Sequence, residues 1–161
     1  GAFAPYKRVD LAIEAFRKLH LPLVVAGGGQ EADRIRDLVK GTKIELLPNP
    51  TNAEVEKHYS ECRALVFPGI EDFGITPLEA MAAGAPVVTI GAGGAQETVT
   101  DQTGIFFQEQ TTESLTGAVL KLERGDVKIT EAACRRRAAD FSKTRFQREF
   151  LAAVDSVRSS S

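Results

Sequence analysis

Short apolar runs alternate with amphipathic segments along most of this chain. Apolar runs that predict buried strands lie at residues 21–26, 44–47, 64–67, 86–90 and 104–107. Elsewhere, apolar side chains recur at intervals of three and four residues, which is typical of helices that bury one face. The helices predicted in this way cover residues 7–19, 32–39, 52–60, 76–83, 95–100, 112–123, 130–139 and 142–157.

This alternation predicts an α/β fold, a Rossmann-like, doubly wound parallel sheet with helices on both faces. Ligands of such sheets bind beyond the carboxyl ends of the strands. Four loops follow predicted strands and therefore gather at that edge, at residues 27–29, 47–50, 68–75 and 91–94. We expect any ligand site to be built from these loops.

The bulk properties fit one globular domain. The chain has 161 residues, of which 43% are hydrophobic and 26% charged. Its net charge of −2 argues against a general nucleic-acid binder, which should be basic. No apolar run approaches the ~20 residues that span a bilayer, and the start does not resemble a signal peptide, so we expect a cytoplasmic protein without a transmembrane segment.

The most informative segment joins the predicted strand at 64–67 to the helix that follows it. Two carboxylates, Glu71 and Glu79, flank this junction, and Thr76 before Pro77 predicts a helix that starts there with Thr76 as its N-cap. Amides at such a helix start lack intrahelical partners and attract anions such as phosphate. Because the flanking carboxylates can accept hydrogen bonds from hydroxyls, the segment fits a nucleotide sugar, a diphosphate with a hydroxylated sugar at each end.

A simpler interpretation of the same residues stays open. Thr76 and Glu79 also have the spacing of a capping box, in which each side chain bonds the backbone of the other. Glu71 fits an ordinary solvated loop acid equally well. Lys7 and Arg8 fit a solvated first helical turn, although cations at a helix N-terminus oppose the helix dipole.

Five ordered segments resemble the retaining glycosyltransferases of family four, which have the GT-B fold. These segments are residues 5–16, 25–29, 67–88, 93–99 and 103–107. The stretches 5–10 and 63–68 look closest to bacterial and archaeal mannosyltransferases of O-antigen and surface-polysaccharide assembly. The resemblance implies that residues 1–158 are the nucleotide-sugar-binding domain, the C-terminal half of a GT-B fold. An N-terminal acceptor domain would then be absent from this sequence, and residues 159–161 would be a disordered tail.

The resemblance also implies roles for individual residues. Glu71 would hold hydroxyls of the donor sugar, and Glu79 would hold the ribose hydroxyls. The amides that would bind the distal phosphate and the sugar belong to Phe73, Gly74, Ile75 and Thr76. Lys7 would neutralise the nucleoside diphosphate as it departs, because fixed cations stabilise charge that develops in the transition state. Glu71 and Lys7 are therefore the expected catalytic residues.

One position departs from the resembled family. Ala2 stands where most members carry an arginine, so one cation of the usual pair is missing, and Arg8 is the candidate substitute. Asn49, in a loop with two prolines, aligns with the part that lies against the base, although a plain turn fits equally well. Arg135, Arg136 and Arg137 are interpreted as an exposed helix face.

The function implied by the resemblance is transfer of a hexose, with mannose from GDP-mannose expected, to a polysaccharide, glycolipid or similar acceptor. No metal and no other cofactor is expected. The expected partners are the nucleotide sugar and the missing domain, without nucleic acid, and the full enzyme can contact the inner face of the membrane peripherally. The isolated domain should be inactive. An apolar stripe on its last helix should be partly exposed and favour a dimer. That stripe comprises Phe146, Phe150, Leu151, Val154 and Val157.

Two other functions are weighed against this one. A nicotinamide-dependent oxidoreductase requires a complete GxGxxG after a first strand, and residues 91–96 lack its last glycine. A non-catalytic module that binds nucleotides or sugar phosphates stays open, because Ala2 is compatible with lost activity.

Overall fold

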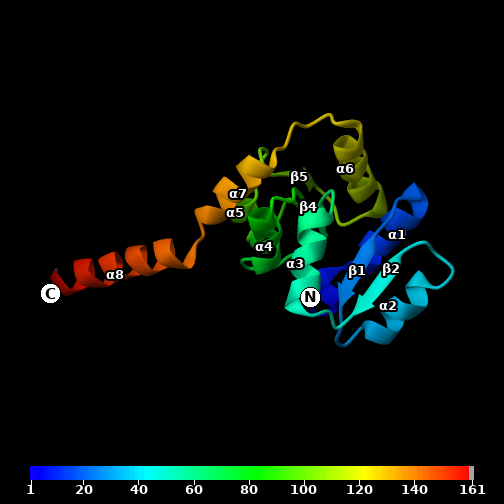
Figure 1. Ribbon diagram of the computed structural model, residues 1–161, viewed down its shortest axis with the longest axis horizontal. Coiled ribbons are helices and arrows are strands. Elements are labelled where there is room, and N and C mark those ends of the chain that lie inside the picture. The colour runs from blue at the N-terminus through cyan, green and yellow to red at the C-terminus, as the bar shows by residue number, and fades with distance from the viewer. Residues whose placement is uncertain (160–161) are drawn as a thin grey trace.

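The computed structural model describes residues 1–159 and has an α/β architecture, with parallel strands between helices on both faces (Figure 1). Its first half consists of the 3-10 turn η1 (Pro5–Lys7), α1 (Val9–Leu19), β1 (Val24–Gly27), α2 (Ala32–Val39), β2 (Glu45–Pro48) and α3 (Asn52–Glu61). Its second half consists of β3 (Leu65–Phe67), α4 (Ile75–Ala83), β4 (Val87–Ile90), α5 (Ala95–Thr98), β5 (Gly104–Phe107), α6 (Thr112–Arg124), α7 (Glu131–Ala139) and α8 (Lys143–Ser159). The predicted fold class is confirmed.

The strands form two short parallel ladders. One pairs β1 with β2, and the other has the order β3-β4-β5. Ala2 forms a parallel bridge with Gly28, and the Phe3 amide donates to the Gly28 carbonyl at 2.6 Å, so the first residues lie beside β1. A Cβ placed on Gly69, two residues after β3, would lie only 2.7 Å from the Lys7 Cα. The turn η1, which follows the first residues, therefore touches the end of β3. The spatial order is therefore β2, β1, the first residues, β3, β4, β5.

Two buried clusters cover the two faces of the strands. Alternate residues of β4 point to opposite faces, so Val88 belongs to one cluster and Val87 to the other. The larger cluster packs α1, α2 and α6 against strands of both ladders, and the smaller packs Met81 of α4 and Cys134 of α7 against β3 and β4. Residues of both ladders thus share one core, although no hydrogen-bonded strand pair joins the ladders within residues 1–159.

Several predicted element boundaries are confirmed, and local chemistry explains them. Thr51 and Glu54 form a capping box at α3, and the Thr111 and Thr130 side chains cap α6 and α7. The first helix was predicted from Lys7, which is wrong by two residues. Arg8 adopts φ 50, a left-handed conformation that separates the turn η1 from α1.

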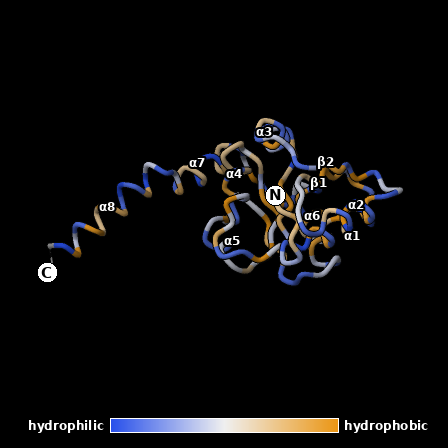
Figure 2. Tube along the Cα trace, turned by 90° about the horizontal axis from the view of Figure 1, so that it is seen from below, coloured by the Kyte–Doolittle hydropathy of each residue, from blue (hydrophilic) through white to orange (hydrophobic). Residues whose placement is uncertain are grey.

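Helix α8 extends away from the rest of the chain (Figure 1), and apolar and polar residues alternate along it (Figure 2). Its apolar stripe is exposed, from 38% at Val154 to 68% at Val157, as predicted. Of the predicted tail at 159–161, Ser159 is the last residue of α8, and the other two serines lie outside the described residues.

Candidate functional site

The order of the strands locates the site. From residues 1–3, β1 and then β2 follow in one direction. In the other direction the turn after residues 1–3 touches the end of β3, beyond which lie β4 and β5. Two loops therefore leave in opposite directions where the first residues meet β3, and such a switch point is where open α/β sheets bind ligands. Lys7 follows the first residues and Glu71 follows β3, so both lie at this switch point.

Lys7 and Glu71 form an ion pair. Lys7 Nζ lies 2.6 Å from Glu71 Oε1, and the two side chains are 20% and 19% exposed. The contact is not aligned as a hydrogen bond, and Glu71 Oε1 is otherwise a buried oxygen without a hydrogen-bond partner in the described part of the chain. The attraction is therefore mainly coulombic, and the pair retains capacity to donate and accept further bonds. This rules out solvated surface positions for both residues.

The turn η1 directs Lys7 toward Glu71. The Lys7 amide donates to the Ala4 carbonyl at 3.0 Å, and Gly69 leaves room for the turn against β3. Left-handed Arg8 then turns the chain into α1, and such a conformation is costly for a residue other than glycine. The Arg8 side chain pairs with Asp10 at 3.2 Å, and Asp10 also contacts Arg34. The described side-chain contact of Arg8 is therefore with Asp10 and not with Glu71.

The start of α4 differs from the prediction. Its N-cap is Gly74 at φ 78, and no side chain caps the helix, so the predicted N-cap Thr76 and the capping box with Glu79 are wrong. The reason is that Gly74 reaches a left-handed conformation at little cost and turns the chain into the helix two residues earlier. Pro77 still lies in the first turn, where its missing N–H is not needed.

This start leaves backbone donors free. Among the described hydrogen bonds, none uses the amides of Phe73, Gly74, Ile75 or Thr76. Ile75 and Phe73 are 64% and 45% exposed, whereas Gly74 is buried and Thr76 is half-buried. Free amides at a helix start favour an anion, as the sequence predicted.

Glu79 lies on α4 and pairs with a residue that the sequence analysis missed. The half-buried Tyr59 of α3 donates its hydroxyl to Glu79 Oε2 at 3.4 Å. Burial and, after it, the Glu79 carboxylate raise the pKa of Tyr59 above its ordinary value, so the hydroxyl remains a donor at neutral pH. Tyr59 therefore orients the exposed Glu79 carboxylate.

Two glycines bring the loop after β4 against residues 71–73. The Gly94 amide donates to the Glu71 carbonyl at 2.8 Å. A Cβ on Gly94 would overlap the Asp72 carbonyl oxygen and the Phe73 Cα, and a Cβ on Gly93 would meet the Glu71 carbonyl oxygen. The glycine-rich segment that fails as a dinucleotide motif therefore serves to support Glu71.

Asn49 lies at the carboxyl end of β2, in a left-handed conformation with φ 47. Its amide donates to the Gly27 carbonyl at 3.0 Å, and its side chain lies where a Cβ on Gly28 would be. Asn49 thus contacts the end of β1, and none of its described contacts reaches Lys7 or Glu71.

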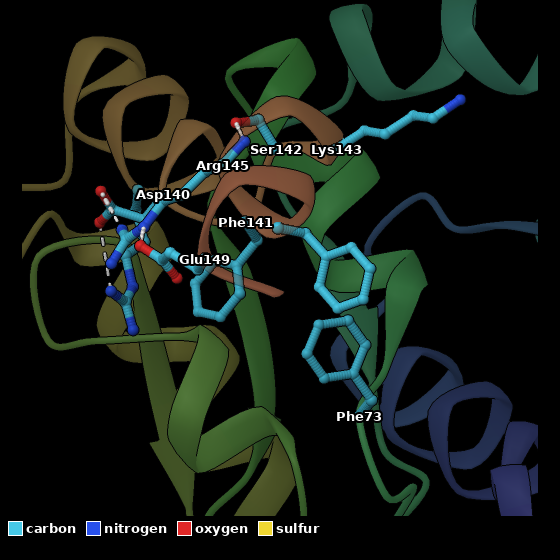
Figure 3. Close-up of a pocket in the computed structure, with 9 residues that line it drawn as sticks. Phe73, Asp140, Phe141, Ser142, Lys143, Arg145 and Glu149 are labelled. Atoms are coloured by element: carbon cyan, nitrogen blue, oxygen red, sulfur yellow. Dashed lines mark hydrogen bonds and ion pairs between the residues drawn. The ribbon is translucent and has the colours of Figure 1, made fainter. Parts of the chain in front are cut away.

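Two hollows in the described part of the chain are not centred on the ion pair. One, of about 630 Å³, is lined by Phe73 and by residues around the α7–α8 junction (Figure 3), and the other, of about 750 Å³, lies beside α1 and α2. Neither includes Lys7 or Glu71. The switch point is the candidate site, because charge, free amides and strand order coincide there, whereas a hollow alone indicates no chemistry.

Arg137 corrects another expectation. Instead of an exposed helix face, its guanidinium donates to the Thr98 carbonyl at 3.0 Å and to the Glu97 carbonyl, and lies 4.8 Å from the centre of the Phe141 ring. Arg135 remains exposed and donates to the Ala83 carbonyl at the end of α4. No sequence signal distinguished these arginines from Arg136.

Residues 1–159 contain no helix that is both long and apolar enough to cross a membrane.

Comparisons with known proteins concern the family and the fold of this chain. The family profile described as "Glycosyl transferases group 1" matches residues 1–141. An uncharacterised glycosyltransferase of Methanocaldococcus jannaschii is 32% identical over 127 residues, which cover 76% of this chain and 36% of that protein. A D-inositol 3-phosphate glycosyltransferase of Kineococcus radiotolerans is 29% identical, and the match covers 88% of this chain and 39% of that protein. The chain thus spans well under half the length of these relatives.

Solved structures show the same fold. Sucrose-phosphate synthase from Thermosynechococcus elongatus superposes with a TM-score of 0.85 at 24% identity, covering 100% of this chain and 45% of that one. The Anabaena protein HepE in complex with UDP has a TM-score of 0.82 at 19% identity, covering 97% of this chain and 47% of that one. These likenesses concern the fold, whereas the profile covers most of the sequence. The chain belongs to the group 1 glycosyltransferases.

Proposed function

We propose that this chain binds a nucleoside-diphosphate sugar and supplies the donor site of a retaining glycosyltransferase that needs no metal. The observation that carries the proposal is the Lys7–Glu71 ion pair at the switch point, next to the free amides at the start of α4. The site offers a cation and amides for a diphosphate, and a carboxylate for sugar hydroxyls. The proposed donor-binding residues are Lys7, Arg8, Asn49, Glu71, Phe73, Gly74, Ile75, Thr76 and Glu79.

The ion pair suits departure of a nucleoside diphosphate. An ammonium group has three N–H donors, so Lys7 can retain Glu71 and also bind a phosphate oxygen. Negative charge grows on that oxygen as the sugar–phosphate bond breaks, and Lys7 stabilises it without reorganising. Glu71 holds sugar hydroxyls with its remaining lone pairs. Arg8 has a smaller role in this proposal, because its side chain pairs with Asp10.

We propose mannose from GDP-mannose as the transferred sugar, with a polysaccharide or glycolipid as acceptor. A Dictyostelium discoideum α-1,3/1,6-mannosyltransferase supports mannose, at 40% identity over 62 residues, which cover 38% of this chain. The HepE complex supports a nucleoside diphosphate as the ligand class, although it holds UDP. The nucleotide base therefore has to be tested directly.

The acceptor site, by this proposal, belongs to a further domain of a longer cytoplasmic protein that contacts the membrane at its inner face. The 161-residue chain should then bind donor without transferring sugar. A non-catalytic binding module makes the same prediction for this chain, so the longer protein has to be assayed for transfer. The oxidoreductase alternative is not favoured, because the family profile covers residues 1–141.

A panel of ligands tests the proposal. Thermal shift of the chain should be measured with GDP-mannose, UDP-glucose, dTDP-rhamnose and NAD, with and without EDTA. We expect one nucleotide sugar to raise the melting temperature, NAD to leave it unchanged and EDTA to have no effect. Stabilisation by NAD alone, or by no nucleotide sugar, would contradict a donor site.

Glu71→Gln should separate the sugar from the nucleotide. The change keeps the shape of the side chain and removes its charge, so hydroxyl contacts of the sugar weaken while the amides of α4 still bind phosphate. We expect the preference for nucleotide sugar over nucleotide diphosphate to fall about tenfold, as for loss of a charged hydrogen-bond partner. Calorimetric titration with both ligands measures this ratio, and equal losses for the two would move Glu71 away from the sugar.

Glu79→Ala should weaken binding of the nucleotide itself by about tenfold through lost ribose contacts. Because Glu79 is exposed and caps no helix, the free energy of unfolding should change by no more than ~0.5 kcal/mol. Tyr59→Phe is the matched control, since it removes only the bond that orients the carboxylate. Its loss of affinity should be smaller. A large loss of stability with unchanged affinity would make Glu79 structural.

A further inference from the structure

We propose that Arg137 and Phe141 are positioning residues that hold the 68–74 loop, and with it Glu71. Phe141 lies between α7 and α8, far in sequence from the loop. The proposal deepens the proposed function, because it concerns residues that set the geometry of the same site without touching its ligand.

The first connection runs through aromatic rings. Phe73 of the loop and Phe141 pack edge to face, with ring centroids 6.0 Å apart and an interplanar angle of 65°. Both side chains line the same hollow (Figure 3). The Arg137 guanidinium lies over the Phe141 ring at 4.8 Å from its centre, and its side chain is only 27% exposed. Arg137 thus fixes Phe141, and Phe141 fixes Phe73.

The second connection runs through α5. Arg137 donates to the carbonyls of Thr98 and Glu97, which lie at the end of this short helix. At its other end, Gly94 donates to the Glu71 carbonyl and abuts the backbone of residues 72 and 73. A single arginine therefore anchors both the ring and the helix that support the loop. Lysine cannot replace Arg137, because contact with three acceptors and one ring face requires the planar guanidinium group and its several N–H donors.

The contacts of Arg137 also reach the start of α8. Asp140 accepts from Arg137 Nη1 at 3.3 Å. It also accepts from Arg145 Nη1 of α8 at 3.3 Å (Figure 3). The Asp140 carboxylate therefore links the start of α8 to Arg137, which supports the loop. The predicted consequence is that residues 72–74 lose order when Phe141 or Arg137 is changed, although neither lies at the ion pair.

Backbone order parameters from NMR of the ligand-free 161-residue chain test the positioning role. In the unchanged chain the Phe73 and Gly74 amides should be rigid, near an order parameter of about 0.85, and in Phe141→Ala they should fall below about 0.6. The matched control is Phe146→Ala, since Phe146 lines the same hollow but stacks on Phe150. Phe141→Tyr keeps the ring and should restore the order.

Arg137→Lys provides a second variant that keeps the charge, and Arg136→Lys is its control, because Arg136 is exposed. Arg137→Lys should loosen the Gly94 amide, seen as hydrogen exchange at least about threefold faster, and Arg136→Lys should not. Unchanged order and exchange in both variants would overturn the proposal. So would an equal change in the controls, which would indicate general loosening of α7 and α8.

The effect on ligands rests on the proposed function. The preference for GDP-mannose over GDP, or for UDP-glucose over UDP, should fall about three- to tenfold in Phe141→Ala, the range for loss of an aromatic pair. It should recover in Phe141→Tyr. If the unchanged chain binds none of these ligands, the proposed function fails, while the order parameters still decide whether Arg137 and Phe141 position the loop. If the unchanged chain prefers the nucleotide sugar and Phe141→Ala keeps that preference, the positioning role would be overturned.

Discussion

Lys7→Ala should weaken binding of nucleoside diphosphates by about ten- to a hundredfold, as expected for loss of a charge-assisted contact. In the ligand-free chain the change leaves Glu71 Oε1 buried without its cation. With ligand bound, the uncompensated carboxylate then repels the phosphates that Lys7 would have attracted. The two effects act in the same direction, so this variant should show the largest loss of affinity at the site.

Calorimetric titration with GDP and UDP at two salt concentrations measures this effect. The loss should be greater for diphosphates than for monophosphates and should shrink at high salt, where charges are screened. Lys18→Ala is the matched control, because Lys18 forms an exposed ion pair with Glu113 at 2.7 Å elsewhere on the chain. An equal loss for monophosphates, or one that salt does not change, would remove Lys7 from the diphosphate site.

Gly94→Ala should lower the free energy of unfolding by about 3 kcal/mol or more, at the upper end for overpacking. The added methyl group would overlap the Asp72 carbonyl and the Phe73 Cα, and backbone atoms cannot rotate away as a side chain would. The φ of −63° at Gly94 suits any residue, so the cost comes from contact and not from backbone strain.

Urea unfolding compares this variant with Gly117→Ala. Gly117 lies inside α6, and nothing lies within 4 Å of the position of its added Cβ. That substitution should therefore raise stability by about 0.5–1 kcal/mol, because alanine favours the helix. If Gly94→Ala proved as stable as the unchanged chain, the close approach of the two loops would be wrong. If it folded but lost its preference for nucleotide sugars, the support of Glu71 by this contact would be confirmed.

Much of this fold is predictable from local patterns. Apolar runs and helical periodicity predicted every strand and nearly every helix, because burial on two faces of a strand, or on one face of a helix, leaves a period in the sequence. Strand β5 was predicted with its observed bounds, and the stripe of α8 was predicted from its spacing, whereas its exposure was expected from the family resemblance. The segments around Glu71 and Lys7 pointed to the carboxyl edge of the sheet, since loops after parallel strands share that edge.

Other features depend on contacts between distant segments. Sequence alone left Lys7 and Glu71 as candidates for solvated residues, and only the strand order, which reverses between the first residues and β3, brings them together. Thr76 had the residue type of an N-cap, but the left-handed Gly74 starts α4 earlier because the chain must turn there out of β3. The preference of Thr76 for the N-cap position was therefore overridden by the direction in which the backbone has to turn.

The arginines of α7 show the same limit most clearly. Arg135, Arg136 and Arg137 are identical in type and adjacent in sequence, so no local pattern separates them. Only Arg137 meets the carbonyls of α5 and the ring of Phe141. Sequence by itself determined which segments form strands and helices, the edge where we propose the ligand site and the charged residues available there. The tertiary structure decided which of those charges meet and which side chains hold them, because packing selects partners far apart in the chain.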